Sequence, residues 1–540
     1  MKDISSTGSF IDFTLENYIY VDKTEYIPKL VKLKRVFISR PRRFGKSLTL
    51  DTIATLFETG VEPYFKGTWI YDKWTEPTYP VLRLNFLNFD KNSLEKFNNK
   101  LNSKITEFAE LNHVTTYKEK EEAEDSIDHL LEQLRLENRQ IVILIDEYDC
   151  QMTANINNES LYKQFQEKIK SIYANIKDKF AIKFLGITGV TRLKDVESFS
   201  VGSDIRDITN SSAYSQMIGF TRDEIKKFYI DYLKSAASYE NNCSVDEVTD
   251  TQLESLLDRL AQNYDGYCFD EDYEKKVFCT WSVNTFLQSV VDKKKVQFGE
   301  YWYDNGGLPS ILVNYLKTHE LNIFEYLDKD KFLKVSTDDF KNPTALTTIN
   351  QNVLMCQTGY LTLRSDLNKT STVALGIPNG EIYKALNRLL ANNIFKGNTD
   401  ITDDYGRSLL EVGTVDDIIN LFNSALNSVS YDNYPIVSES SVQNMLKLYL
   451  LGAHQEVLSE VHEAKGRADL IVNTDNRRIV FEFKYAKNET ETKAKLSEAV
   501  EQIKTRDYGN ILPKKNELLR IATVFNADPK VRAFTEYQEV

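Results

Sequence analysis

Residues 40–47, RPRRFGKS, form a segment whose residue types suit the binding of nucleotide phosphates. They lie between an apolar run and a stretch with helical spacing, and Gly45, Lys46 and Ser47 fit the pattern GxxxxGK[ST]. In that pattern backbone N–H groups surround the phosphates, the lysine reaches the β- and γ-phosphates, and the hydroxyl binds Mg²⁺. The segment therefore predicts a nucleotide site built on a strand, a loop and a helix.

The match has two departures, which a second segment offsets. Arg40 stands where the pattern has its first glycine, and Pro41 lacks a backbone N–H. Further along, the run 141–147 (IVILIDE) is apolar until it ends in Asp146 and Glu147. We expect Asp146 to hold the metal and Glu147 to orient or deprotonate the attacking water. Each segment alone also fits a solvated basic loop or a helix cap, but together they predict nucleotide binding.

The loop belongs to a basic stretch, since the sequence has no acidic residue between Glu25 and Asp51. Such a patch favours a triphosphate or a nucleic-acid backbone, and Arg43 is counted with the cofactor-binding residues. Beyond it, Thr188 ends another apolar run and is placed to sense the γ-phosphate, and Arg192 is placed to stabilise transition-state charge. A turn threonine and a surface arginine are the ordinary alternatives. The basic residues of the stretch are Lys29, Lys32, Lys34, Arg35, Arg40, Arg42, Arg43 and Lys46.

A second group of charged residues lies near the carboxyl terminus. Asp469 begins one β-like run, and Glu482 and Lys484 end the next. Because side chains alternate along a strand, Glu482 and Lys484 project to one face, and a hairpin brings Asp469 near that face. Two carboxylates with a carbonyl group and waters suit Mg²⁺, and the lysine can position or activate a water beside a phosphodiester. Glu460, on or near a preceding helix, is a candidate third carboxylate; a solvent-facing charged strand is the alternative for the group.

The hydrophobic pattern predicts the elements that position the first group. Apolar runs separated by helical stretches are typical of an α/β fold with a mostly parallel sheet. From about residue 221 to 430 the pattern changes to amphipathic helices with few strands. The predicted strands are 36–38, 81–86, 141–146 and 183–190, and the predicted helices are 25–34, the stretch from 47 onward, 94–112 and 123–138.

The second group belongs to a smaller α/β domain that follows a joint at 430–435. There a predicted helix at 439–451 precedes strands at 468–473 and 478–485, with a turn between them, and a helix at 492–504 follows. The chain is therefore divided into an N-terminal α/β domain (1–220), a mostly helical middle region (221–430) and a small C-terminal α/β domain (431–540).

Composition excludes several classes of protein. The 540 residues include 41% hydrophobic and 27% charged residues and have a formal net charge of −13, which is a globular composition. No stretch is apolar enough for a membrane span, and the N-terminus lacks the layout of a secretory signal. Five scattered cysteines without a CxxC pair argue against a zinc ribbon or disulfide scaffold and favour a reducing, cytoplasmic location. Five dispersed histidines give no metal cluster.

Short motifs occur in order along the chain: YVDKT (20–24), RPRRFGKS (40–47), LIDEYD (144–149), TGVTR (188–192), GFT (219–221), YDGYCF (264–269), TGYLTL (358–363), IPNGE (377–381) and GRADL with FEFK (466–484). In these motifs the chain resembles the bacterial AAA-ATPase-like proteins that have a C-terminal PD-(D/E)XK nuclease-type domain, over nearly its whole length. The phosphate loop of that family also lacks the first glycine, so Arg40 is no departure from it.

The resemblance implies a function for both groups, with ATP and Mg²⁺ as cofactors. The expected partner is nucleic acid, DNA more than RNA, without a membrane, and assembly through the ATPase domain is a further expectation. Nucleotide state is expected to set the arrangement of the middle region and so to gate the nuclease. By the resemblance the ATP and Mg²⁺ site is Lys46, Ser47, Asp146 and Glu147, and the nuclease site is Glu460, Asp469, Glu482 and Lys484.

Two alternatives stay open. One is an ATP-dependent binding or effector protein whose nuclease-like domain recognises a partner without cleaving it. The other is a nucleotide sensor that binds ATP without turnover. Metal binding that depends on Asp469 and Glu482 separates the first from a nuclease, and turnover separates the second from an ATPase.

Overall fold

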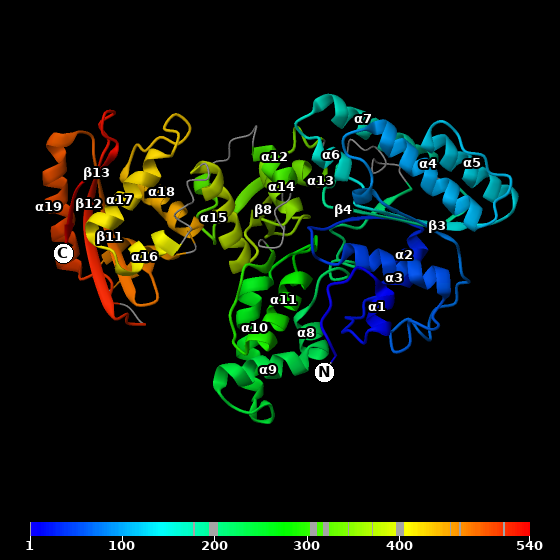
Figure 1. Cartoon of the computed structure of the whole chain (residues 1–540), viewed down its shortest axis with the longest axis horizontal. Coiled ribbons are helices and arrows are strands. Elements are labelled where there is room, and N and C mark those ends of the chain that lie inside the picture. Colours follow the sequence, from blue (N-terminus) through cyan, green and yellow to red (C-terminus); the bar gives the residue numbers. More distant parts are fainter. Residues whose placement is uncertain are drawn as a thin grey trace. The chain divides into compact units, whose positions relative to one another are not determined.

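The structure is a computed structural model and describes residues 2–176, 179–193, 204–302, 310–316, 323–343, 345–369, 371–395, 404–453, 455–463, 466–510 and 513–540. The chain forms two compact units, one of Met1–Leu321 with Phe332–Ile382 and one of Asn322–Lys331 with Tyr383–Val540 (Figure 1). The phosphate loop, residues 40–47, lies in the first unit, and the carboxylates near the carboxyl terminus lie in the second.

A parallel sheet of five strands forms the centre of the first unit. The strands are β1 (Arg35–Ser39), β2 (Val81–Asn85), β3 (Ile141–Asp146), β4 (Ile182–Gly189) and β5 (Arg206–Asp207), in the spatial order β2-β3-β4-β1-β5. β3 is buried along its whole length, as expected for a parallel strand covered on both faces. Because all strands run the same way, the carboxyl ends of β1, β3 and β4 meet at one edge of the sheet.

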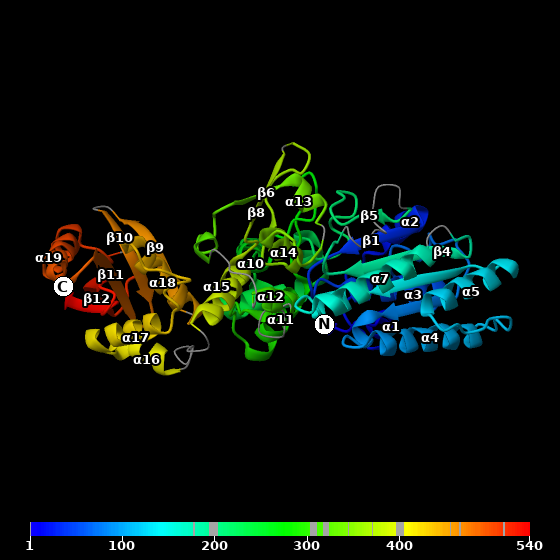
Figure 2. The ribbon, with the colours of Figure 1, turned by 90° about the horizontal axis from the view of Figure 1, so that it is seen from above.

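Helices cover both faces of this sheet (Figures 1 and 2). One example shows why the helices dock: α4 (Leu94–Leu111) buries Phe97, Leu101, Ile105 and Phe108, which recur at helical spacing. The other elements here are α1 (Phe10–Leu15), η1 (Thr24–Tyr26), α2 (Ile27–Leu33), α3 (Lys46–Thr59), η2 (Phe86–Asn88), α5 (Ala123–Leu136), α6 (Cys150–Ala154) and α7 (Glu159–Ile176). α1, α2 and α3 lie on one side of the sheet and α4, α5 and α7 on the other. The predicted α/β fold is confirmed.

The rest of the first unit is mostly helical, as the sequence predicts. The apolar faces of its first four α-helices pack around Ile19 and Val21 of the N-terminal segment. The helices are α8 (Arg222–Phe228), α9 (Ile230–Asn241), η4 (Val245–Glu247), α10 (Asp250–Tyr264), α11 (Thr280–Lys293), α12 (Ser310–Leu316), α13 (Thr337–Lys341) and α14 (Gln351–Thr358).

The sequence does not predict a small antiparallel sheet in this helical region. β6 (Leu333–Ser336) pairs with β8 (Thr372–Gly376), and β8 pairs with β7 (Thr362–Leu363). These strands are too short for a period of two to stand out from a helical background.

A mixed sheet of five strands forms the second unit, in the order β13-β12-β11-β10-β9. Its strands are β9 (Glu456–Glu463), β10 (Gly466–Asn473), β11 (Arg477–Ala486), β12 (Glu517–Asn526) and β13 (Ala533–Glu539). Val480 packs with Ala499 and Ile503 on one face, and Phe481 packs on Phe422 on the other. The helices are η6 (Ile323–Glu325), α16 (Asp404–Val412), α17 (Val415–Asn427), α18 (Glu439–Gly452), α19 (Glu489–Arg506) and α15 (Gly380–Ile394), within which the chain passes from the first unit to the second. The small α/β fold is confirmed.

In the part of the chain that the structure describes, no helix is long and apolar enough to cross a membrane. All five cysteines lie in the first unit, and all are unpaired. Burial raises the pKa of the Cys150 and Cys268 thiols to about 11 and of the Cys279 and Cys356 thiols to about 12. Four of the five thiols are therefore protonated at neutral pH.

Candidate functional site

The phosphate loop joins β1 to α3 through two residues in the left-handed backbone region, Arg43 (φ 70°) and Gly45 (φ 102°). They turn the chain so that α3 begins at Lys46, and Thr49 N–H donates to the Gly45 carbonyl at 3.0 Å. The N–H groups of the first helical turn have no partner inside the helix. Together with the positive end of the helix dipole they can bind an anion. A Cβ atom at Gly45 would meet nothing within 4 Å, so the loop opens into free space there.

Arg40 explains how the loop forms without the first glycine. The backbone at Arg40 is not left-handed, and its side chain is 1% exposed. Its Nη1 donates to the carbonyl oxygens of Ser39 and Thr209 at 2.9 and 2.6 Å, and its guanidinium lies 4.1 Å from the centre of the Phe269 ring. Burial lowers its pKa to about 9, which leaves it charged at pH 7. Arg40 therefore anchors the start of the loop to the segment that follows β5.

A polar group gathers where β3 and β4 end beside α3. Ser47 Oγ donates to Asp146 Oδ2 at 2.6 Å, and Thr188 Oγ1 donates to Asp146 Oδ1 at 2.5 Å. Strand order explains the group, because β4 lies between β1 and β3 and carries Thr188 to the loop. The structure thus brings Ser47, Asp146 and Thr188 together. It adds Asn85, at the end of β2, whose Nδ2 lies 3.4 Å from Asp146 Oδ2 and which the sequence analysis missed.

Lys46 lies inside the loop and faces Glu147. Its Nζ donates to the carbonyl oxygens of Arg40 and Pro41 at 3.0 and 3.2 Å and lies 3.5 Å from Glu147 Oε1. Glu147 has a φ of 54°, which non-glycine residues adopt rarely, and this turn takes its carboxylate from the end of β3 toward the lysine. Lys46 is 4% exposed, yet it and Glu147 line the same pocket.

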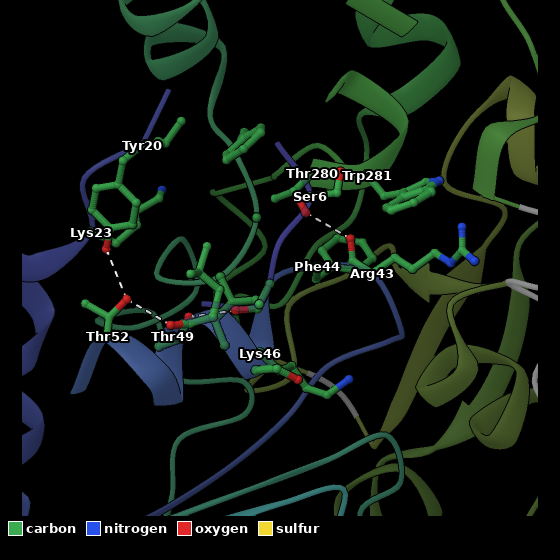
Figure 3. Close-up of a pocket in the computed structure, with 18 of the residues that line it drawn as sticks. Ser6, Tyr20, Lys23, Arg43, Phe44, Lys46, Thr49, Thr52, Thr280 and Trp281 are labelled. Carbon is green, nitrogen blue, oxygen red and sulfur yellow. Dashed lines mark hydrogen bonds between the residues drawn. The ribbon is translucent and has the colours of Figure 1, made fainter. Parts of the chain in front are cut away.

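This pocket, of about 540 Å³, opens beside the phosphate loop (Figure 3). Residues 45–47 line it, together with the segments 5–8, 19–21 and 217–220. Its lining combines polar side chains, such as Ser6 and Lys46, with apolar ones, such as Ile19. A lining of both kinds suits a nucleotide, which has charged phosphates and an aromatic base. The sequence analysis missed these lining segments because only the fold brings them to the loop.

Two residues predicted to bind the cofactor make other contacts. The Arg43 guanidinium lies 4.4 Å from the centre of the Trp281 ring, and Figure 3 shows the two side chains next to each other. Arg192 forms an ion pair with Asp207, and its backbone exchanges two hydrogen bonds of 3.2 Å with the Gln357 side chain. Arg192 does not line this pocket but lines a smaller one, of about 40 Å³, together with Arg40 and Pro41 of the phosphate loop.

Residues of the middle region donate hydrogen bonds to backbone carbonyl groups of the phosphate loop. Thr280 Oγ1 donates to the Arg43 carbonyl at 2.9 Å, and Trp302 Nε1 donates to the Arg42 carbonyl at 3.3 Å. Glu381, at the start of α15 and 2% exposed, accepts a hydrogen bond of 2.7 Å from the Trp302 N–H. A line of hydrogen bonds therefore runs from the loop backbone to the first turn of α15.

Motifs without chemistry of their own fit around this support. Gly359 of TGYLTL has a φ of 94°, and a Cβ atom there would lie 2.9 Å from Pro41 Cβ in the loop. Gly266 of YDGYCF has the same φ, and its Cβ atom would lie 2.3 Å from the carbonyl oxygen of Pro378 in IPNGE. Each position needs glycine because the backbone is left-handed and another segment approaches closely. We therefore assign these motifs to the support of the loop.

In the second unit, β10 and β11 form the predicted hairpin and bring three charged side chains together. Its register places Asp469 opposite Glu482, and directly opposed residues of an antiparallel pair share a face. Asp469 Oδ2 accepts a hydrogen bond of 2.9 Å from the Phe483 N–H. Lys484 Nζ donates to Glu482 Oε1 at 3.0 Å and to the Phe483 carbonyl at 3.1 Å. The geometry expected for Asp469, Glu482 and Lys484 is present.

The electrostatics of this group are set by the burial of Glu482, which is 0% exposed. Burial, and then the charge of Asp469, raises the pKa of Glu482 to about 7. Burial alone would lower the pKa of Lys484, but the nearby carboxylates of Glu482 and Glu439 outweigh it and raise that pKa. Within the described part of the chain Glu482 Oε2 is buried without a hydrogen-bond partner. Such an atom costs about 1–3 kcal/mol unless a ligand satisfies it.

Helix α18 contributes two residues that the sequence analysis missed. Glu439 Oε1 lies 3.4 Å from Lys484 Nζ, and Gln443 Nε2 donates to the Asp469 carbonyl at 2.5 Å. Glu439 and Gln443 are four residues apart and so lie on one face of the helix. No local signal distinguishes them, because the same helix carries other polar residues, namely Ser440, Ser441, Asn444 and Lys447.

Glu460 lies in strand β9 rather than on a helix, which corrects the expectation from the sequence. β9 is an edge strand, and natural sheets often place charged residues on their edges to prevent pairing with other chains. This explains why EVLSEVHE looks like the surface of a helix. The side chain of Glu460 lies outside what the structure describes, so its role as a third carboxylate stays a prediction.

Both groups offer donors that fit Mg²⁺. No cluster of three or more His, Cys, Asp or Glu side chains in the described ranges could hold a metal ion. The donors present are the carboxylates of Asp469 and Glu482 with the Phe483 carbonyl, and the hydroxyl of Ser47 with the carboxylate of Asp146. All are oxygen atoms, and Mg²⁺ binds few protein oxygens and keeps several waters. The partnerless Glu482 Oε2 is a further sign that the second group accommodates a cation.

Comparisons with known proteins assign both ends of the chain. Residues 5–199 match the family described as a predicted AAA-ATPase, and residues 437–534 match the PD-(D/E)XK nuclease superfamily. A protein described as uncharacterised, from the vnfD 5′ region of Azotobacter chroococcum mcd 1, is 26% identical over 534 residues, which are 95% of this chain and 94% of that protein.

Two solved structures give weak matches. Cdc6p from Pyrobaculum aerophilum is 10% identical with a TM-score of 0.24 and covers 69% of this chain and 96% of its own. The ORC1 protein of Aeropyrum pernix in complex with DNA is 10% identical with a TM-score of 0.27 and covers 71% and 97%. Scores this low support no conclusion about this chain. The family matches confirm the resemblance at both ends of the chain: residues 5–199 form a domain of the predicted AAA-ATPase type, and residues 437–534 form a domain of the PD-(D/E)XK nuclease superfamily.

Proposed function

We propose that this protein binds and hydrolyses ATP and that its nuclease-type domain cleaves phosphodiester bonds of nucleic acid with Mg²⁺, DNA in preference to RNA. The proposal includes a cytoplasmic location, assembly through the ATPase domain, and the functional division 1–220, 221–430 and 431–540. The observation that carries it is the buried Glu482, which accepts a hydrogen bond from Lys484 through Oε1 and has no hydrogen-bond partner for Oε2 among the described residues.

The phosphate loop supports the ATP part. The first-turn N–H groups of α3 and the Lys46 ammonium surround the place where the pattern holds phosphates, and Ser47 with Asp146 would hold Mg²⁺. The ion, when bound, neutralises charge on the phosphate groups. Glu147, already turned toward Lys46, would orient or deprotonate the attacking water. Thr188 supports Asp146 and would lie near the γ-phosphate.

Arg43 and Arg192 keep their proposed roles only if each leaves its present contact. Arg43 would leave Trp281 and turn to the phosphates, and Arg192 would leave Asp207. A guanidinium group presents several N–H donors to phosphate oxygens, so either arginine could stabilise the transition state once its side chain reaches the phosphates.

In the second unit Asp469 and Glu482 would hold Mg²⁺ together with the Phe483 carbonyl. The ion supplies Lewis-acid stabilisation of a phosphodiester and a more acidic bound water. The Phe483 N–H donates to Asp469 Oδ2 and so restricts the position of that carboxylate. Lys484 is held by Glu482 and would position the attacking water or the scissile phosphate. Glu439, beside Lys484, is our candidate for an additional carboxylate, and Glu460 remains one.

We also propose that nucleotide state gates the nuclease through the middle region. The support for this is the line of hydrogen bonds from the Arg42 carbonyl through Trp302 to Glu381 at the start of α15, the helix in which the chain enters the second unit. A phosphate bound by the loop changes the position of the loop backbone, and these bonds pass the change to α15.

The test is a paired assay of phosphate release and plasmid integrity in Mg²⁺ or Mn²⁺, on wild type, Lys46→Met and Asp469→Asn. Lys46→Met should lose ATP turnover, because the substitution removes the Lys46 ammonium group that would contact the phosphates. Asp469→Asn should lower cleavage by more than about a hundredfold, since even outer-shell changes at metal sites cost 10–100-fold. Cleavage by Lys46→Met that no longer responds to ATP would support gating.

Matched variants exclude trivial causes. Lys96→Met removes a lysine from the first turn of another long helix, α4, and Asp475→Asn makes the same change at the exposed tip of the β10–β11 hairpin. Both should behave as wild type. If wild type and Asp469→Asn nick plasmid equally at background level, the nuclease claim fails and the binding or effector alternative is favoured. If wild type binds ATP without releasing phosphate, the chain is a nucleotide sensor.

A further inference from the structure

A second basic site lies at the opposite edge of the sheet from the phosphate loop. The sequence suggests one patch in the acid-free stretch between Glu25 and Asp51, but β1 divides this stretch. Residues 40–46 follow β1 and reach the phosphate loop, whereas residues 32–35 precede or begin it. A strand of this length spans roughly 16 Å, so the two sets of cations form separate sites.

Lys32 and Lys34 line a groove of about 750 Å³. Arg35, Gln140 and Ile182 also line it, which places the groove at the amino ends of β1, β3 and β4. Six cationic side chains and one carboxylate, that of Glu76, line the groove. The cationic residues are Lys32, Lys34, Arg35, Lys73, Lys179 and Lys183.

Part of this charge is uncompensated. Three of the cations have carboxylate partners: Arg35 with Asp204 at 2.8 Å, Lys179 with Asp128 at 2.5 Å and Lys183 with Glu76 at 2.6 Å. Lys32, Lys34 and Lys73 have no such partner among the residues that the structure describes, and all three are exposed. A local excess of positive charge in a chain of net charge −13 indicates a surface for a polyanion.

The groove also offers aromatic rings. Phe180 lines it and is 60% exposed, and Trp74 lines it from another segment. Trp74 is half-buried against Phe57, so Phe180 is the exposed ring. An exposed ring beside several cations suits a single strand of nucleic acid, because a base stacks on the ring while the cations meet the phosphates. The cations come from three separate segments, a spread that matches a chain of phosphates better than one phosphate ion.

We infer that this groove binds the sugar–phosphate backbone of nucleic acid and holds it on the ATPase domain while the nuclease-type domain acts. The choice of nucleic acid over another polyanion rests on the proposed function. The site is separate from the ATP pocket, so nucleic acid and ATP bind at the same time, and loss of groove cations leaves ATP affinity unchanged.

The test uses the full chain with a short fluorescein-labelled single-stranded DNA of mixed sequence, in EDTA so that no cleavage occurs. Fluorescence anisotropy gives the affinity over a series of salt concentrations for wild type and for Lys32→Gln/Lys34→Gln. The two lysines are exposed and unpaired, so the double variant should fold. The control is Lys293→Gln/Lys295→Gln, which removes two exposed lysines at the same spacing elsewhere in the first unit.

We expect the groove variant to bind roughly 10–50-fold more weakly at 100 mM salt, with a salt slope lower by about two, while the control matches wild type. ATP affinity should be the same in all three proteins. Equal DNA affinity and slope in wild type and groove variant overturns the inference, as does competition by polyglutamate that equals competition by unlabelled DNA.

The outcome is distinct from that of the proposed function. If the groove variant binds DNA as wild type does while Asp469→Asn abolishes cleavage, the groove is wrong and the nuclease stands. If binding depends on the groove while wild type does not cleave in Mg²⁺ or Mn²⁺, the groove stands and the nuclease is wrong.

Discussion

Glu482 is a carboxylate placed where its charged form is disfavoured. Its side chain is fully buried and its neighbour Asp469 is also an acid, and these effects outweigh Lys484, which favours the negative charge. The pKa of Glu482 therefore rises to about 7, so near neutral pH the group is divided between its protonated and charged forms. A divalent cation changes this balance, because it binds only the charged form.

We therefore predict that metal affinity depends on pH through Glu482. Below pH 7 the carboxyl group must release a proton before it binds the cation, so the dissociation constant rises as pH falls; above pH 7 it is nearly constant. Between pH 7.5 and pH 5.5 the affinity for Mn²⁺ should fall about 20–30-fold, the effect of one proton with a pKa near 7. Calorimetric titration of the nucleotide-free chain with Mn²⁺ measures this.

Glu482→Gln is the matching variant, because glutamine resembles the protonated acid in shape but cannot ionise. It should bind Mn²⁺ weakly at every pH and show little of this dependence. A wild-type affinity that is the same at pH 5.5 and pH 7.5 would contradict the role of Glu482.

At the scale of elements, the phosphate loop depends on segments distant in sequence. Arg40 fixes its start, and Trp302 and Thr280 bind its carbonyl groups. Gly359, after α14, packs directly on Pro41. The loop lacks the first glycine of the pattern. These contacts hold it in one shape and so make the conformational freedom of that glycine unnecessary.

Gly359→Ala should therefore weaken ATP binding. An alanine at this φ of 94° costs about 1 kcal/mol, and its Cβ atom 2.9 Å from Pro41 Cβ must displace the loop. We expect a dissociation constant for a fluorescent ATP analogue several-fold higher than that of wild type. Gly67→Ala is the control, since Gly67 also has a left-handed φ, of 86°, but a Cβ atom there meets nothing within 4 Å.

Gly67→Ala should lower the melting temperature, because its backbone strain is similar to that of Gly359→Ala. It should leave the affinity for the ATP analogue unchanged. Equal ATP affinity in wild type and Gly359→Ala would show that the contact with Pro41 does not shape the loop.

The sequence predicts the elements whose pattern is strong and local. Buried parallel strands such as β3 read as unbroken apolar runs, and the α4 pattern repeats over several turns, so both were predictable. β6 and β7 have four and two residues, too few for any period. The sequence analysis predicts no strand at β9 and expects Glu460 on or near a helix, because an edge strand carries charges like those of a helix surface.

The candidate sites follow the same division. Loop and hairpin residues lie close together in sequence at fixed spacings, so Lys46 with Ser47, and Glu482 with Lys484, could be grouped from sequence alone. Glu439 and the segment 5–8 reach their sites only through tertiary packing, which leaves no local signal. The ion pair of Arg192 with Asp207 depends on the pairing of β5 beside β1, and a strand of two residues is not predictable.

At the scale of the whole molecule, each ligand site is built within a single compact unit. A ligand that binds only the folded form stabilises the unit that holds it, by about 2.7 kcal/mol at one hundred times its dissociation constant. We predict that a non-hydrolysable ATP analogue with Mg²⁺ raises the melting temperature of the first unit, and that Mn²⁺ alone raises that of the second. Differential scanning calorimetry measures both.

Variants assign the transitions. Lys46→Met should lose the shift caused by the ATP analogue and keep the shift caused by Mn²⁺, and Asp469→Asn should do the reverse. A single transition that moves equally with either ligand would mean that the two units unfold as one and that their separate stabilities have no meaning.

The distribution of cysteine gives the chain a built-in reporter. Thiolate is the form that alkylating reagents attack, and burial keeps the thiols of Cys150, Cys268, Cys279 and Cys356 protonated. These four thiols should therefore stay unmodified until the first unit unfolds. The second unit has no thiol and gives no signal at any stage. Mass spectrometry after timed iodoacetamide treatment would thus record the unfolding of the first unit alone, in the wild-type chain and without any engineered label.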